Sequence, residues 1–178
     1  MTSTFEQHLF EQRIQVPAHK TEQIVISLPG KYHIELTGPG ARAEIVGQFM
    51  VKDREVCNIE IYIFHKSGHT SAQTTLKGVA YDFGQLRFFG RIVIEPGCPD
   101  TQSFLEERIL LLSDHAKAEA VPELEILSDD VKCSHAASMS RIPEEHLFYL
   151  QSRGLQRKVA EDAIVAGFLN FPAGDEDV

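Results

Sequence analysis

Short runs of alternating apolar and polar residues, separated by turn signals, fill the chain from about residue 13 to residue 130. The segment QLRFFGRIVIE shows the alternation best, with apolar or small residues at every second position: Leu86, Phe88, Gly90, Ile92 and Ile94. Several Pro-Gly, Gly-Pro-Gly and Asp-Phe-Gly turn signals lie about 14 residues apart, whereas tight β-sandwiches show roughly 8 to 12. This spacing leaves a sandwich, a jelly roll and a stacked solenoid open, because no fixed sequence repeat accompanies it.

The character of the chain changes after Ser140, where two helices are expected. Pro143 suits the first helical position, and Gly154 suits a left-handed stop. A second helix is expected over about residues 156–169, with an apolar stripe at the helical period: Ala160, Ile164, Gly167 and Phe168. One helix cannot bury all of the apolar run at 147–150 against one sheet, so part of this run should face a partner.

Composition excludes several classes of function. With 178 residues, 43% of them hydrophobic, the chain suits one globular domain. A formal net charge of -9 without a Lys/Arg cluster argues against nucleic acid or an anionic membrane as a partner. No apolar run approaches the roughly 20 residues of a membrane helix, and the acidic start is unlike a secretory signal. Three scattered cysteines predict free thiols in a reducing cytoplasm.

Cys133 and His135 form the most conspicuous candidate site. On a strand both side chains point to one face, about 6.6 Å apart along the strand, which is wide for two ligands of one tetrahedral metal. The residues alone therefore favour packing at the end of a sheet over a metal site.

Other motifs point away from catalysis. His65 and His69 are four residues apart, but a Ser-Gly turn separates them, so they are not expected to form a metal pair. The chain has neither a Gly-x-Ser-x-Gly elbow nor a phosphate-binding Gly-x-x-x-x-Gly-Lys-Ser/Thr loop. We therefore expect a protein that does not hydrolyse nucleotides itself.

Four ordered phrases resemble the C-terminal end of the SufB/SufD family of iron–sulfur cluster assembly proteins. They lie between about Thr101 and Leu169 and read ERILLLSDHAKAEAVPELEI, DDVKCSH, LFYLQSRGL and GFL. The upstream stretch TLKGVAYDFGQLRFFGRIVIEPG fits the family more loosely, and residues before about Gly40 show no useful match. The chain is under half the usual family length.

The resemblance implies a mainly β fold, namely a right-handed parallel β-helix with a C-terminal helix pair. It also implies that two such subunits pair through their β-helices, and that the terminal helices dock an ABC-type ATPase of the Suf system. His135 falls on the family's histidine near the subunit interface, and Cys133 matches the cysteine of the SufD-type KCSH phrase. The sulfur-accepting cysteine and the functional glutamate of SufB-type chains have no counterpart, so the chain resembles the accessory SufD type.

From these features we expect four regions: N-terminal strands that cap the β-helix, the β-helix core, a partner-docking helical segment and a disordered acidic tail. Their residues are 1–39, 40–140, 141–171 and 172–178. We expect Phe148, Tyr149 and Arg153 to contact the ATPase. Cys133 and His135 would bind metal in an iron–sulfur cluster shared with a SufB-like chain or a second copy of this chain, with no other cofactor.

Two alternatives remain open. One is a reduced β-helix that binds other proteins and has lost cluster chemistry. The other is a small cupin-like metal enzyme, which would need several His and Glu ligands to converge inside a barrel. The spacing of His33, His65 and His69 does not obviously supply that convergence.

Overall fold

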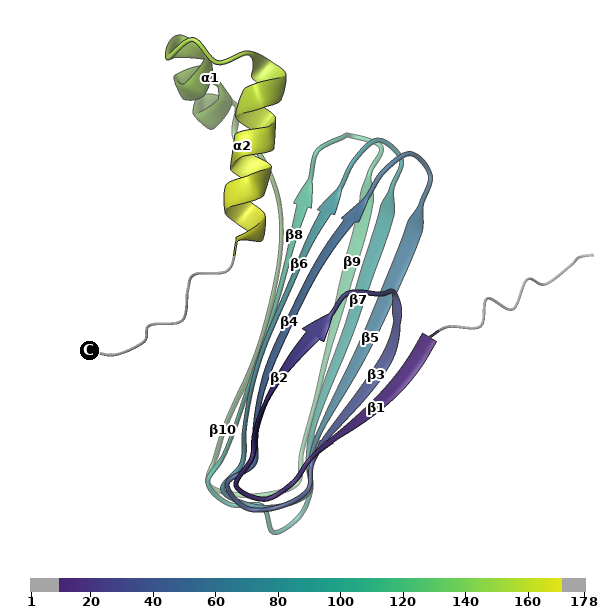
Figure 1. The fold of residues 1–178 in the computed structure, drawn as a ribbon, viewed down its shortest axis with the longest axis vertical. Helices are drawn as coiled ribbons and strands as arrows, with labels where there is room; N and C mark the ends of the chain where they lie inside the picture. The colour runs from purple at the N-terminus through teal and green to yellow at the C-terminus, as the bar shows by residue number, and fades with distance from the viewer. Residues whose placement is uncertain (1–9, 171–178) are drawn as a thin grey trace, which may run out of the picture.

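The computed structural model describes residues 10–170, which form ten β-strands followed by two α-helices (Figure 1). Residues 1–9 and the proposed tail at 172–178 lie outside the described part. The strands are β1 (Phe10–Val16), β2 (Thr21–Ile26), β3 (Gly30–Leu36), β4 (Arg42–Val51), β5 (Val56–His65), β6 (Ser71–Ala80), β7 (Gln85–Ile94), β8 (Thr101–Leu111), β9 (Lys117–Ile126) and β10 (Val131–Arg141). The helices are α1 (Glu144–Ser152) and α2 (Arg157–Leu169).

The strands form two five-stranded parallel sheets that face each other (Figure 1). The odd-numbered strands make one sheet, in the order β1-β3-β5-β7-β9, and the even-numbered strands make the other, in the order β10-β8-β6-β4-β2. Because successive strands alternate between the sheets, the chain winds as a flattened solenoid. This confirms the parallel β-helix and excludes the sandwich and the jelly roll, which are antiparallel.

The strand register explains the spacing of the turn signals. Ile34 pairs with Ile63, and Ile63 pairs with Ile92, so one coil is about 29 residues long. A coil contains two strands and two turns, which places a turn about every 14 residues. The inward positions of these strands stack into ladders, and all three isoleucines are fully buried. The alternation therefore has the two-residue period of strands with one face in a core.

The N-terminal strands continue the solenoid instead of packing across its open end. β1 pairs with β3, and β2 pairs with β4 in parallel, with Ile24 opposite Ile45. Both of these isoleucines belong to the buried core. The coils thus begin well before residue 40: β1 and β2 pair in register with the next coil, and β3 alternates in burial like the later strands.

The helix pair packs on the outer face of the even-numbered sheet (Figure 1). Val165 of α2 forms a buried cluster with Val79 of β6 and Leu110 of β8. Just past the C-terminal end of α2, the carbonyl oxygen of Asn170 accepts a hydrogen bond of 2.6 Å from Nζ of Lys77. Pro143 is the residue just before α1 and not its first helical residue. The described solenoid and helix pair match the expected fold class.

Candidate functional site at the last coil

Cys133 and His135 lie on β10, which is the last strand of the even-numbered sheet and has a strand neighbour, β8, on one side only. Both side chains point inward, as the strand period requires. Cys133 is half-buried and packs against the hydrophobic core. The side chain of His135 is only 2% exposed. The two residues therefore line the interior of the solenoid at its last coil.

A carboxyl group that the sequence analysis did not select accompanies His135. Glu107 of β8 is fully buried, and its Oε2 lies 3.2 Å from Nε2 of His135. The two atoms are within ion-pair distance, but they are not aligned as a hydrogen bond. The position of Glu107 in the alternating pattern could have revealed it. A charged residue there occupies an inward position between Leu105 and Ile109, which are both buried.

The interior becomes more polar toward this coil. Ser103 is the register partner of Cys133 and is fully buried, as is Thr74 of β6. At the N-terminal coils, in contrast, the inward positions of β3 carry Tyr32, Ile34 and Leu36. Buried polar groups are costly unless they are paired. Their concentration in the last coils therefore distinguishes this end from the rest of the core.

Burial keeps the three cysteines in the thiol form. It raises the pKa of the Cys133 thiol and of the Cys98 thiol above their ordinary value, and it raises the pKa of Cys57 to about 11. All three cysteines are free. Cys57 is on β5, and Cys98 lies in the turn before β8. The thiolate is the form that binds metal and acts as a nucleophile, so none of these thiols is activated by its surroundings.

Cys133 and His135 do not complete a metal site within the described chain. Among residues 10–170, no three His, Cys, Asp or Glu side chains converge in a way that could hold a metal ion. Structural zinc and iron–sulfur sites usually need four protein ligands. The chain by itself thus offers at most part of a ligand set at this coil.

The three histidines considered for a cupin-like site, His33, His65 and His69, lie in different environments. His65 is fully buried, and its Nδ1 lies 2.8 Å from the hydroxyl of Thr70. His69 is exposed in a turn and pairs with Asp100 at 3.0 Å. His33 lies on the opposite face of its strand from the core and stacks on Tyr62. The cupin-like alternative is therefore wrong, because the fold is a solenoid of parallel strands and these three histidines do not share one interior site.

The helix pair exposes the residues expected to contact a partner. Leu147 is buried, whereas Phe148 and Tyr149 are 75% and 58% exposed. The guanidinium of Arg153 lies over the ring of Tyr149, 5.3 Å from its centroid. This confirms that the apolar run at 147–150 is not all buried against one surface.

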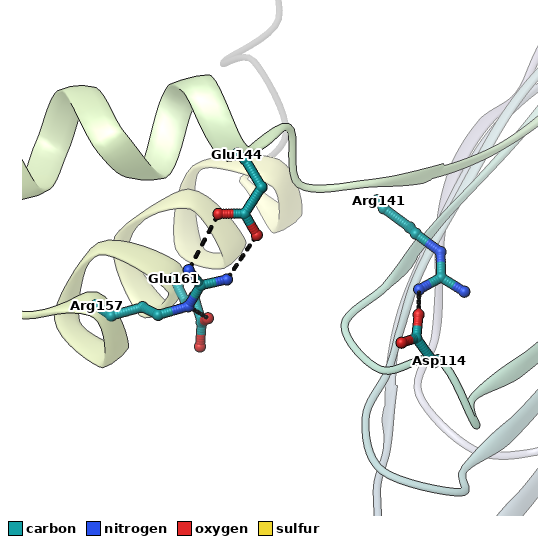
Figure 2. A network of polar contacts seen from close by, with 5 residues as sticks. All are labelled: Asp114, Arg141, Glu144, Arg157 and Glu161. Atoms are coloured by element: carbon teal, nitrogen blue, oxygen red, sulfur yellow. Dashed lines mark hydrogen bonds and ion pairs between the residues drawn. The ribbon is translucent and has the colours of Figure 1, made fainter.

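Ion pairs fix the start of both helices (Figure 2). Arg157, at the start of α2, donates two hydrogen bonds of 2.8 and 3.1 Å to the carboxylate of Glu144, at the start of α1. It also pairs with Glu161 at 3.1 Å. A separate contact joins Arg141, at the end of β10, to Asp114 in the loop before β9 (Figure 2). The exposed aromatic residues are therefore carried by a braced helical hairpin.

Within residues 10–170, neither helix has the length and apolar character needed to cross a membrane.

Comparison with known proteins places the chain in a family. The family described as "SUF system FeS cluster assembly, SufBD core domain" matches residues 27–168. The chain is 32% identical to the iron-sulfur cluster assembly protein SufD of Escherichia coli over 75% of its length, which covers 32% of that relative. It is 31% identical to Protein ABCI7, chloroplastic, of Arabidopsis thaliana, over 83% of this chain and 32% of the relative.

A SufBD family protein of Mycobacterium leprae is 28% identical over 76% of this chain and 37% of the relative. The chain thus spans about a third of the length of the curated relatives it matches. The matched region contains all the strands from β3 onward and nearly all of the helix pair. The chain belongs to the SufBD core family of iron–sulfur cluster assembly proteins.

Proposed function

We propose that this chain is a non-enzymatic, SufD-like accessory subunit that pairs with another SufBD subunit and contributes Cys133 and His135 to iron–sulfur cluster assembly. The observation that carries the proposal is the buried, polar last coil: Cys133 and His135 lie on β10, which has one strand neighbour among the described residues, and Glu107 lies on that neighbour, β8. The relatives whose names refer to cluster assembly support the same process.

The end of the solenoid is suited to pairing. β9 and β10 each end their sheet, so each has one edge whose N–H and C=O groups lack a strand partner within the described residues. Natural proteins cover such edges or pair them with another chain. α2 packs over β6 and β8 on the outer face of the sheet. We propose that a SufB-like chain or a second copy of this chain pairs at these edges.

The cluster would be cargo held jointly with the partner. Cys133 offers a sulfur ligand, and His135 offers an imidazole nitrogen, which are ligand types that iron–sulfur centres use. Because the described chain supplies no third converging ligand, the partner subunit would supply the others. Since burial raises the pKa of Cys133, loss of its proton would accompany metal binding.

The helical hairpin is the proposed docking site for the ABC-type ATPase of the Suf system. Phe148 and Tyr149 give exposed aromatic area, and Arg153 adds charge at its rim. Aromatic residues and arginine are enriched among the residues that dominate binding energy at interfaces. The hairpin is a separate element from the last coil, so docking and cluster chemistry are separable by mutation.

The test is cluster assembly by the complete complex of this chain, its SufB-type partner and the ATPase, under anaerobic conditions. Cys133→Ser and His135→Ala should each lower the iron and sulfide bound per complex at least several-fold, while the complex still forms on size exclusion. Cys98→Ser and His69→Ala are matched controls on other coils, and they should retain wild-type loading. Wild-type loading by both site variants would contradict the proposed role.

The second candidate is a β-solenoid that binds partner proteins without cluster chemistry. The specific observation in its favour is that the described chain contains no set of three converging metal-binding side chains. The same experiment separates the two candidates. Complexes that form normally, and load iron equally with wild-type chain and with the Cys133→Ser/His135→Ala double variant, would favour this second function.

A further inference from the structure

We infer that Glu107 is a positioning residue that holds His135 through Nε2 and leaves Nδ1 as the nitrogen offered to a metal. This inference rests on the proposed function of His135, and it assigns a role to a residue that carries none in the resemblance to the family. Its basis is the juxtaposition of Glu107, His135 and Gly90 inside the last coils.

The contact between Glu107 and His135 is isolated from solvent and from other charges. The side chains are 0% and 2% exposed, and Oε2 lies 3.2 Å from Nε2. Among the described residues, no hydrogen bond reaches either carboxyl oxygen of Glu107, and the basic side chain within ion-pair distance of it is His135. Burial of an unpaired carboxylate is strongly unfavourable, so Glu107 and His135 depend on each other.

The register brings these two residues together from different coils. His135 is opposite Leu105, and Glu107 is opposite Ala137, so the contact runs diagonally across β8 and β10. The small side chain of Ala137 leaves room along this diagonal. Long side chains in neighbouring strands can reach such diagonal partners.

Gly90 of β7, on the facing sheet, provides the space that the pair occupies. A Cβ atom at this position would lie 2.3 Å from Cδ2 of Leu105, 2.8 Å from Cε1 of His135 and 3.0 Å from Oε1 of Glu107, so these side chains would have to move. Its register neighbours on the same sheet are Ile61 and Pro122, which are larger. Glycine weakens a strand interior and often marks a close approach by another group, and here the approaching groups are the Leu105 side chain, this imidazole and this carboxyl.

A carboxylate that accepts from one ring nitrogen of a histidine fixes the tautomer and the ring orientation, and it leaves the other nitrogen free to bind metal. In this protein Nε2 lies at ion-pair distance from Glu107 without hydrogen-bond alignment, and we infer that the carboxylate holds the proton on Nε2 and leaves Nδ1 as the other nitrogen. Exposed histidines carry no such constraint. The chain therefore presents His135 in one defined orientation before any metal arrives.

The first test reads the ring of His135 directly in the full chain, by nitrogen-15 NMR of histidine-labelled protein at pH 8. In the wild type, the proton should reside on Nε2 and Nδ1 should be unprotonated. Glu107→Leu should abolish this preference and shift the His135 signals. Glu106→Gln changes an exposed neighbour on the outer face of β8, and it should leave the signals unchanged. Unchanged His135 signals in Glu107→Leu would overturn the inference.

Two further variants keep the test decisive if Glu107→Leu fails to fold. Glu107→Gln retains the volume and one carbonyl acceptor, so it should retain the Nε2–H tautomer more fully than the leucine variant. Gly90→Ala leaves Glu107 intact but intrudes on Leu105, on the His135 imidazole and on the Glu107 carboxyl group, so it should also move the His135 signals. If a folded Gly90→Ala protein shows wild-type His135 signals, the positioning geometry is wrong.

The complete assembly complex then links positioning to function. Glu107→Leu should lower iron loading at least several-fold, and Glu107→Gln should retain more of it. Wild-type loading by Glu107→Leu would overturn the link. Loading that is insensitive to His135→Ala would instead reject the proposed function, whereas the NMR result for the isolated chain would still decide whether Glu107 positions the ring.

Discussion

At the scale of single residues, contacts between buried hydroxyl and imidazole groups connect successive turns at one corner of the solenoid. Nδ1 of His65 lies 2.8 Å from the hydroxyl of Thr70, and the Thr70 hydroxyl lies 3.4 Å from that of Thr101, one coil further on. Thr101 in turn donates to the carbonyl oxygen of Cys98 at 2.9 Å. These contacts satisfy polar groups where the backbone leaves one sheet for the other.

His65 makes stability depend on pH. Burial lowers its pKa from an ordinary 6.5 to about 4. The unfolded chain therefore binds this proton at a higher pH than the folded chain, and stability falls as the pH decreases from about 6.5 to about 4. At pH 4.5 the expected loss from this group is about 2–3 kcal/mol. Urea unfolding of wild type and His65→Asn at pH 7.5 and pH 4.5 measures it, and an equal loss in both proteins would contradict the assignment.

The buried pair at the last coil predicts a non-additive pattern of stability. His135→Ala should reduce the free energy of unfolding by about 2–4 kcal/mol, because it leaves Glu107 buried without its partner. The double variant His135→Leu/Glu107→Leu should cost less than the sum of the single leucine variants, because no charge is left buried. Chemical unfolding of all variants at pH 7.5 gives the cycle. Strict additivity would mean that the two groups do not interact.

At the scale of elements, the helical hairpin is a braced platform for two exposed aromatic side chains. The Glu144–Arg157 contact joins the starts of α1 and α2, and Val165 attaches α2 to the sheet. Surface ion pairs contribute little stability individually, so the buried cluster around Val165 provides most of the attachment.

The docking role of the hairpin predicts a selective loss of binding. Tyr149→Ala/Arg153→Ala should weaken capture of the cognate ATPase by about tenfold or more, while the solenoid unfolds at an unchanged temperature. The matched control is Phe83→Ala/Arg54→Ala. It removes a similar pair from two turns of the solenoid, where the Arg54 guanidinium lies 5.7 Å from the centroid of the exposed Phe83 ring. Equal binding by the two double variants in a calorimetric titration would reject this role.

The sequence predicted the elements better than it predicted their alignment. Alternation identified the strand around Ile92, and the Pro143 and Gly154 signals bracketed α1. The contact between His135 and Glu107 could not be predicted, because it depends on which residues of successive coils face each other. That register follows from the coil length, which no sequence repeat marks. Ile63 pairs with Ile92 and Ile92 pairs with Leu124, so the second of these two coils is three residues longer than the first.

The same limitation explains the error at the N-terminal end. The early strands were expected to pack across the open end of the solenoid, because a bare terminal coil would expose unpaired apolar core. Tyr32 and Ile34 nevertheless occupy inward positions like those of the later coils, and they are buried. Alternation alone shows that such a segment has one buried face, but it does not show which core that face joins.

At the scale of the whole molecule, the exposed edges of β9 and β10 predict pairing. A parallel solenoid that ends in unpaired strands is stabilised when a second chain adds to it. In the absence of a SufB-type partner, we expect the isolated chain to form a two-fold dimer at micromolar concentration. Light scattering coupled to size exclusion measures the mass, and a stable monomer at that concentration would contradict pairing between copies.

The central claim is that the chain contributes part of a cluster site and cannot complete that site alone. Anaerobic reconstitution of the isolated chain with iron and sulfide, followed by metal and sulfide analysis, tests it most directly. We expect far less than one cluster per chain, and stoichiometric loading only when the partner subunit is present. A stoichiometric, visible-absorbing cluster on the isolated chain that disappears in Cys133→Ser would contradict the claim.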